Sequence, residues 1–269
     1  MAHNFIFGTG VSSAKRYEEL RDLIECNIEH GIVKFDTAPS YKTENVLGSI
    51  LSEIRKKRQI ARDNIYIQTK IDAWQMQNGN IRKFVCEALK NLDTDYIDAL
   101  LIHWPVPDYL KKTWDDFINL KKEGYIKSIG ICNARERQLK EWVLWENKPE
   151  IIQIERNPLR VCEREIKICR DNGIEIQAYS PLCKMNKKIK DSTVLSQIAH
   201  KYNKNIGQIV MRWHIDTGVI PIYTTTRENR VREYTDIYDF ELSENEVKSI
   251  NELNENYKMY LEAWACPGF

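Results

Sequence analysis

The chain has 269 residues, of which 42% are hydrophobic and 10% aromatic, which is enough apolar material for a sizeable core and argues against intrinsic disorder. Forty Lys and Arg residues against 39 Asp and Glu residues leave a net charge of +1, so the protein lacks the positive field that holds nucleic acid or a membrane surface. The amino terminus has no basic segment followed by a long apolar one, and no stretch reaches the ~18 apolar residues of a membrane span. We therefore expect a cytoplasmic protein that binds neither nucleic acid nor a membrane.

The cysteines and histidines lack the spacings typical of a disulfide framework or a metal site. The seven cysteines are an odd number without a C-x-x-C pair, and the five histidines include no H-x-x-x-H pair. We therefore expect reduced cysteines that pack in the core, and no bound metal.

Short apolar runs typical of β-strands alternate with longer segments of helical period from one end of the chain to the other. This alternation is typical of α/β proteins with a parallel sheet. The sequence predicts strands over residues 5–7, 32–35, 65–69, 97–102, 126–130, 151–154, 174–178 and 219–222.

The segments between these strands carry apolar residues at three- and four-residue steps, which predicts amphipathic helices with one face on the sheet. One helix follows Thr43, a predicted N-cap, and a pair of helices follows the seventh strand at about residues 195–202 and 209–213. Ser243 and Glu246 have the spacing of a capping box and predict a last helix that runs to about Asn256.

Eight strand–helix units in 269 residues average roughly 34 residues each, the length of one βα repeat. No linker or shift in composition divides the chain, so residues 1–269 are predicted to form one domain, a (β/α)8 TIM barrel. A doubly wound sheet is the alternative. It is disfavoured because the turn after the first strand, which begins at Gly8, lacks the third glycine of a G-x-G-x-x-G turn.

In a barrel of this kind the chemistry lies at the carboxyl ends of the strands, so the residues that end or follow each apolar run are the candidate functional residues. They are Asp36 to Tyr41 after the second strand, Lys70 after the third, His103 and Trp104 after the fourth, Cys132 and Asn133 after the fifth, Gln153 in the sixth, and Tyr179 to Leu182 after the seventh.

Four of these side chains form a candidate acid–base set. A tyrosine hydroxyl has an ordinary pKa of about 10, and a nearby ammonium lowers that pKa by stabilising the phenolate. We expect Lys70 to act in this way on Tyr41, while Asp36 holds the ammonium in place and charged. His103 would orient a carbonyl oxygen at the Tyr41 hydroxyl. Taken singly, the lysine is also typical of a solvated loop and the histidine of a core, and none of the four supplies a hydride.

Five motifs occur in order along the chain: F-D-T-A-x-x-Y followed by E-x-x-L-G, T-K at the end of a strand, L-x-H-W-P, G-x-I-K-S-I-G-x-x-N, and A-Y-S-P-L. Over about residues 5–255 the sequence resembles the aldo-keto reductase superfamily. The resemblance implies reduction of an aldehyde or ketone to an alcohol, with NADPH as the hydride source. It makes Tyr41 the general acid, Asp36 and Lys70 its tuning pair, and His103 the residue that orients the carbonyl.

The resemblance also implies the residues that contact the nicotinamide half of the cofactor. Asn133 and Gln153 would hydrogen-bond the carboxamide, and the ring of Tyr179 would stack on the nicotinamide and fix one face for transfer. Gly8, Thr9 and Asp36 would approach the ribose of the nicotinamide. Ser180 and Leu182 would line the pyrophosphate.

The site of the adenosine 2′-phosphate departs from the family pattern. Many family members carry P-K-S after the eighth strand, whereas this chain has Pro221-Ile222-Tyr223 followed by three threonines. Thr224 and Thr225 could offer hydroxyls to a phosphate, and Arg227 and Arg230 could clamp it, because guanidinium groups suit phosphate oxygens. Alternatively, the two arginines lie on the first turn of the following helix and bind no phosphate. We favour NADPH, with NADH possible.

Trp74 and Trp104 are the predicted walls of the substrate pocket, and the aromatic tail at residues 257–269 either returns over the barrel mouth or packs on the outer helices. A largely aromatic pocket without a clear arginine favours a small neutral carbonyl substrate. We expect a monomer or a weak homo-oligomer.

Two other functions fit the same barrel. One is an NADP(H)-binding regulatory or redox-sensing subunit with slow turnover. The other is a lyase with Lys70 as a Schiff-base nucleophile, which Asp36 disfavours by keeping the lysine protonated.

Overall fold

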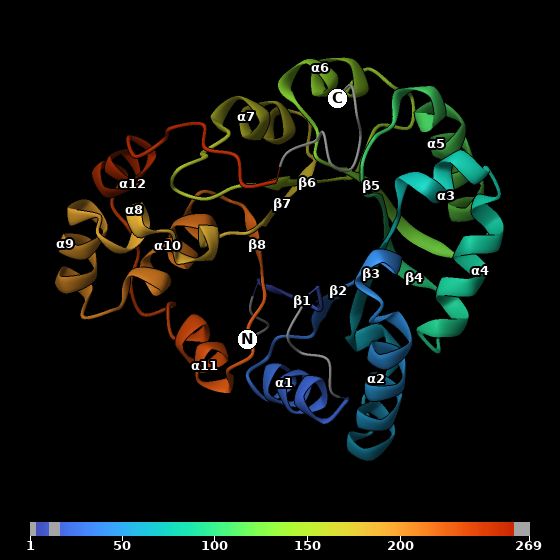
Figure 1. Cartoon of the computed structure of the whole chain (residues 1–269), viewed down its shortest axis with the longest axis horizontal. Helices are drawn as coiled ribbons and strands as arrows, with labels where there is room; N and C mark the ends of the chain where they lie inside the picture. Colours follow the sequence, from blue (N-terminus) through green and yellow to red (C-terminus); the bar gives the residue numbers. More distant parts are fainter. Residues whose placement is uncertain (1–3, 11–16, 261–269) are drawn as a thin grey trace.

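In the computed structural model, which describes residues 4–10 and 17–260, parallel strands close into an eight-stranded barrel in chain order (Figure 1). The barrel closes where β8 pairs with β1, with Ile222 opposite Ile6. This confirms the predicted TIM barrel, and each predicted strand lies within two residues of an observed one. The strands are β1 (Ile6–Gly8), β2 (Lys34–Asp36), β3 (Tyr66–Ile71), β4 (Ile97–Ile102), β5 (Ile126–Cys132), β6 (Ile151–Glu155), β7 (Glu175–Tyr179) and β8 (Ile220–Tyr223).

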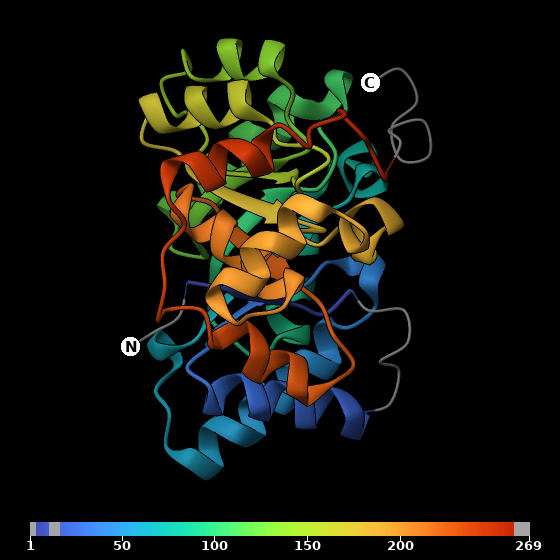
Figure 2. The same ribbon diagram turned by 90° about the vertical axis from the view of Figure 1, so that its left-hand side faces the viewer.

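The helices form a ring outside the barrel (Figure 1), and Figure 2 turns toward the viewer the side that α9 and α10 cover. None of the described helices is long and apolar enough to cross a membrane. The α-helices are α1 (Tyr17–Glu29), α2 (Glu44–Arg58), α3 (Ala73–Asn78), α4 (Ile81–Asn91), α5 (Pro107–Lys122), α6 (Glu136–Trp142), α7 (Glu163–Asp171), α8 (Lys187–Lys190), α9 (Thr193–Tyr202), α10 (Ile206–Asp216), α11 (Glu228–Thr235) and α12 (Glu244–Asn251). Short 3-10 helices are η1 (Pro39–Tyr41), η2 (Arg62–Asn64) and η3 (Cys183–Met185).

The predicted helix starts are confirmed at α12 and only partly at α2. Ser243 Oγ accepts a hydrogen bond from the Glu246 N–H at 3.3 Å, as a capping box requires, although α12 ends at Asn251 rather than near Asn256. Thr43 precedes α2 as expected, but its side chain makes no capping bond. Its hydroxyl instead bonds the hydroxyls of Thr9 and Thr37 at 2.7 and 3.0 Å, which ties the start of α2 to the ends of β1 and β2.

The interior of the barrel next to Asp36 is polar. Gln68, Gln153 and Gln177 point inward from three strands, and their side-chain amides bond one another. Gln68 Nε2 also donates to Asp36 Oδ1 at 2.6 Å. Because each buried amide has hydrogen-bond partners, the network avoids the cost of unpaired polar groups. Its bonds to Asp36 hold that carboxylate in a fixed position.

Candidate active site

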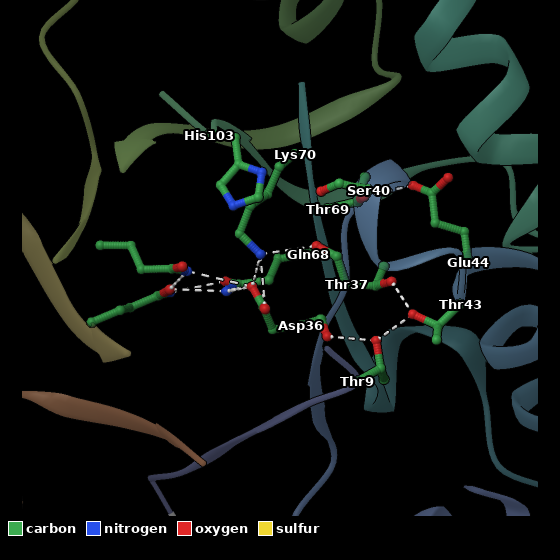
Figure 3. Close-up of polar contacts among 12 residues, drawn as sticks. Thr9, Asp36, Thr37, Ser40, Thr43, Glu44, Gln68, Thr69, Lys70 and His103 are labelled. Atoms are coloured by element: carbon green, nitrogen blue, oxygen red, sulfur yellow. Dashed lines mark hydrogen bonds and ion pairs between the residues drawn. The ribbon is translucent and has the colours of Figure 1, made fainter. Parts of the chain in front are cut away.

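Parallel strands with their carboxyl ends at one rim bring the four predicted catalytic residues together. Asp36 is the last residue of β2, Tyr41 ends η1, Lys70 lies in β3, and His103 follows β4. Figure 3 shows the Lys70 ammonium between His103 and the carboxylate of Asp36, with the side-chain amide of Gln68 beside that carboxylate.

Lys70 and Asp36 form a buried ion pair. The Lys70 Nζ donates to both carboxylate oxygens of Asp36 at 2.7 and 2.8 Å, and to the Thr37 carbonyl oxygen at 2.9 Å. Burial is the largest single effect and alone would lower the pKa of Lys70, but the charge and hydrogen bonds of Asp36, with smaller contributions from Tyr41 and Cys132, together outweigh it and raise that pKa. The nitrogen therefore stays an ammonium without a lone pair, which argues against the Schiff-base lyase.

Tyr41 is partly buried and packs against both the ammonium and the histidine. The Lys70 Nζ lies 4.7 Å from the centroid of the Tyr41 ring, and the His103 ring meets that ring edge-on at 5.7 Å between centroids. Burial raises the pKa of Tyr41 to about 12, although Lys70 lowers it as the sequence predicts. The sequence predicts a lowered pKa for Tyr41, and this prediction is wrong for the net shift, because desolvation raises that pKa by more than Lys70 lowers it. At neutral pH the hydroxyl is protonated and can act as an acid.

Asp72 is a site residue that the sequence analysis missed. Its Oδ1 lies 2.5 Å from Nδ1 of His103, and its Oδ2 accepts a hydrogen bond from the backbone N–H of Ser40 at 2.9 Å. Asp72 thus links the histidine to η1, which carries Tyr41. Gln68, Lys70 and Asp72 are every second residue of one segment, and that two-residue period is the signal that could have found it.

The residues expected at the nicotinamide lie next to this set. Asn133 Nδ2 donates to the backbone oxygen of His103 at 2.9 Å, and the hydroxyl of Tyr179 donates to Asn133 Oδ1 at 2.7 Å. Gln153 Nε2 donates to Gln177 Oε1 at 3.0 Å. A side-chain amide has two hydrogens and two lone pairs, so Asn133 and Gln153 keep capacity for a further polar group.

One cavity of about 680 Å³ connects these residues with the loop after β8. The cavity is also lined by residues beside the amino terminus of α11: Thr224, Thr225, Arg227 and Arg230. Arg230 also pairs with Glu233 at 2.7 Å. The predicted site residues along the wall of the cavity are Gly8, Asp36, Tyr41, His103, Trp104, Asn133, Gln153, Tyr179, Ser180, Leu182, Thr224, Thr225, Arg227 and Arg230.

Three predicted site residues are not among the described residues that line this cavity. Lys70 lies beneath it in the ion pair. The Thr9 hydroxyl is turned toward the backbone oxygen of Asp36 and toward Thr43. Trp74 lies in α3, where its ring packs edge-on against Phe84 and is 56% exposed, so the structure does not bring it to the expected pocket wall.

The structure adds lining residues from two later segments. Lys184 and Met185 belong to η3, and Tyr260 comes from the tail. The carboxylate of Glu155 accepts hydrogen bonds from the N–H groups of Met259 and Tyr260 at 2.8 and 3.1 Å. The tail therefore reaches the mouth of the barrel, as the first of its two predicted positions requires, and residues 261–269 lie outside the described residues.

Comparisons with known proteins agree with this geometry. The profile of the Aldo/keto reductase family matches residues 4–255. The chain is 34% identical to glyoxal reductase of Bacillus subtilis and 35% identical to methylglyoxal reductase of Escherichia coli (strain K12), over 94% of this chain and 90% of each relative. The solved structure of a Bombyx mori aldo-keto reductase in complex with NADP has a TM-score of 0.86 at 30% identity and covers 97% of this chain and 92% of that one. The chain therefore belongs to the aldo/keto reductase family and is an oxidoreductase.

Proposed function

We propose that this oxidoreductase reduces a small neutral aldehyde or ketone to an alcohol with NADPH, and that Tyr41 supplies the proton. The observation that carries the proposal is the placement of a protonated tyrosine hydroxyl on the same cavity wall as His103, beside a buried ammonium. The names of the two bacterial reductases, glyoxal and methylglyoxal reductase, support a small dicarbonyl as the substrate class.

The cavity fits an extended dinucleotide phosphate. Asn133 and Gln153, with their amide groups, and Tyr179, with its ring, line the cavity together and suit a carboxamide-bearing ring. Arg227 and Arg230 also line the cavity, where they suit phosphate oxygens. NADPH bound in this way supplies a hydride. The residues of this chain would hold the cofactor and supply the proton to the carbonyl oxygen.

The proton step follows from the charges around Tyr41. Its hydroxyl donates a proton to the carbonyl oxygen as that carbon is reduced, and the oxygen of the product becomes the alcohol hydroxyl. The negative charge left on the phenolate is stabilised by the adjacent Lys70 ammonium. Asp36 keeps that ammonium in place, and a proton from solvent restores the tyrosine.

The test is steady-state consumption of NADPH by the purified protein with methylglyoxal, followed by its loss of absorbance. We expect turnover that rises to saturation with methylglyoxal, and one carbonyl group converted to one new alcohol group for each NADPH consumed. Tight binding of NADPH without turnover of methylglyoxal or other small aldehydes would instead support the regulatory subunit.

Replacing Arg227 or Arg230 by alanine is expected to weaken NADPH binding about tenfold and leave NADH binding unchanged. Each guanidinium forms a charge-assisted bond to the 2′-phosphate, and NADH lacks that group. Quenching of intrinsic fluorescence during titration with each cofactor measures both affinities. Arg232→Ala is the matched control, because Arg232 lies on the same helix, is exposed and is not among the residues lining the cavity. Equal weakening of both cofactors would contradict this assignment.

A further inference from the structure

Asp72, which is buried, and His103, which is partly buried, form a hydrogen-bonded pair next to the proposed proton donor. Oδ1 of Asp72 lies 2.5 Å from the histidine Nδ1 and 3.2 Å from the Ser40 hydroxyl, which donates to it. Oδ2 accepts the Ser40 backbone N–H. Nε2, on the far side of the imidazole, has no hydrogen-bond partner among the residues that the structure describes, and His103 lines the cavity.

The carboxylate decides which ring nitrogen carries the proton. Burial alone would raise the pKa of Asp72, but the hydrogen bond and charge of His103 and the two hydrogen bonds from Ser40 together outweigh it and lower that pKa, so the group is ionised at neutral pH. An ionised carboxylate only accepts hydrogen bonds, so the nitrogen at 2.5 Å must be the donor. A neutral imidazole has one N–H, and placing it on Nδ1 leaves a lone pair on Nε2.

We propose that Asp72 is a positioning residue for the reaction: its carboxylate keeps the proton of neutral His103 on Nδ1, so that Nε2 can donate a hydrogen bond to a carbonyl oxygen only when the imidazole has taken up a second proton. The role rests on the proposed carbonyl reduction, whereas the position of the proton does not. Tyr41 is then the single donor at the carbonyl oxygen when His103 is neutral. The imidazolium adds a second donor.

The charges that face His103 determine when the imidazolium forms. Asp72 on one side and Asp36 behind it favour the charged ring, whereas burial and the Lys70 ammonium disfavour it, and burial is the largest effect. Tyr41 packs against the ring and is uncharged at neutral pH. The pKa of His103 is therefore lowered, and the second donor is lost as the pH rises through that lowered pKa.

Asp72→Asn tests this inference because the backbone of Ser40 dictates how the new amide is oriented. The Ser40 N–H can only donate, so the amide oxygen must take the place of Oδ2. The NH₂ group then faces Nδ1 of His103 and donates to it. The proton of the neutral imidazole must move to Nε2, where it points into the cavity.

The first readout is the nuclear magnetic resonance spectrum of the whole protein with isotope-labelled histidine, because nitrogen chemical shifts separate protonated from unprotonated ring nitrogens. The signals are assigned by their loss in His103→Gln. We expect neutral His103 to be protonated on Nδ1 in the wild type and on Nε2 in Asp72→Asn. A wild-type protein with the proton on Nε2 overturns the inference, whether or not the variant folds.

Gln75→Ala is the matched structural control. Gln75 Oε1 accepts the backbone N–H of Asp72 at 2.9 Å at the start of α3, so this change loosens the same turn without touching the histidine. We expect the Nδ1 proton to be retained in this variant. A proton that moves in Gln75→Ala as well would show that packing of the turn, rather than the carboxylate, sets the tautomer.

The second readout is the pH profile of kcat with saturating methylglyoxal. In the wild type we expect kcat to fall about 10²-fold as the pH rises through the pKa of His103, because one donor to the developing oxyanion is lost. In Asp72→Asn the step is expected to disappear, because neutral His103 then donates from Nε2. A step that persists in the variant overturns the catalytic role of the pair. Absence of any turnover in the wild type would instead be a failure of the proposed function, and the tautomer measurement would still stand.

Discussion

Replacing Tyr41 by phenylalanine is expected to lower kcat for carbonyl reduction by about 10²–10⁴-fold while the protein still binds NADPH. The change removes only the hydroxyl that donates the proton. The ring keeps its edge-on contact with His103 and its place over the Lys70 ammonium, so the shape of the cavity is preserved.

Two measurements separate this chemical loss from a structural one. Steady-state turnover of methylglyoxal gives kcat, and a fluorescence titration gives the affinity for NADPH in the same preparation. Tyr66→Phe is the control, because Tyr66 is a second tyrosine of the barrel whose hydroxyl bonds Gln68 below the site. Full turnover in the Tyr41→Phe variant would rule out Tyr41 as the acid. A wild type no faster than the variant would favour the regulatory subunit.

Lys70→Met is expected to lower the free energy of unfolding by about 3–5 kcal/mol and to abolish most activity. Methionine has nearly the length of lysine but no charge, so Asp36 is left ionised and buried with only amide donors from Gln68 and Gln153. The activity falls because the phenolate at Tyr41 loses its stabilising ammonium.

The double variant Lys70→Met with Asp36→Asn tests the cause of that destabilisation. Asparagine carries no charge, and its oxygen can still accept the hydrogen bond from Gln68. We expect the double variant to recover part of the lost stability in urea unfolding and none of the lost activity. Lys70→Met alone with less than about 1 kcal/mol of destabilisation would contradict a tightly coupled buried pair.

Most of the site could be predicted because it depends on a local pattern. The apolar runs mark the strands, and the residues at their ends reach one rim whenever the strands are parallel. Asp36, Lys70 and His103 follow from this rule with no knowledge of contacts. Asp72 did not, because the predicted strand stopped at residue 69 and its partner His103 is 31 residues away.

The orientation of side chains on short helices and loops was harder to predict than the position of residues at strand ends. Trp74 follows β3 as closely as a pocket residue would, but α3 turns its ring toward Phe84. Thr9 follows β1 as a cofactor-binding residue would, but its hydroxyl bonds the hydroxyl of Thr43 and does not line the cavity. Tyr260 reaches the cavity because Glu155, more than 100 residues earlier, accepts two backbone N–H groups of the tail.

The sequence by itself determined the barrel, its strand order and which polar residues lie at the carboxyl ends of the strands, because strand periodicity and the parallel arrangement follow from residue order. Only the tertiary structure decided the electrostatics of these residues. The pKa of Tyr41 rises although Lys70 is adjacent, because the depth of burial depends on everything packed around the ring. The orientation of His103 depends on Asp72, and this hydrogen bond forms only when β3 and β4 have paired, with Ile71 opposite Ile102.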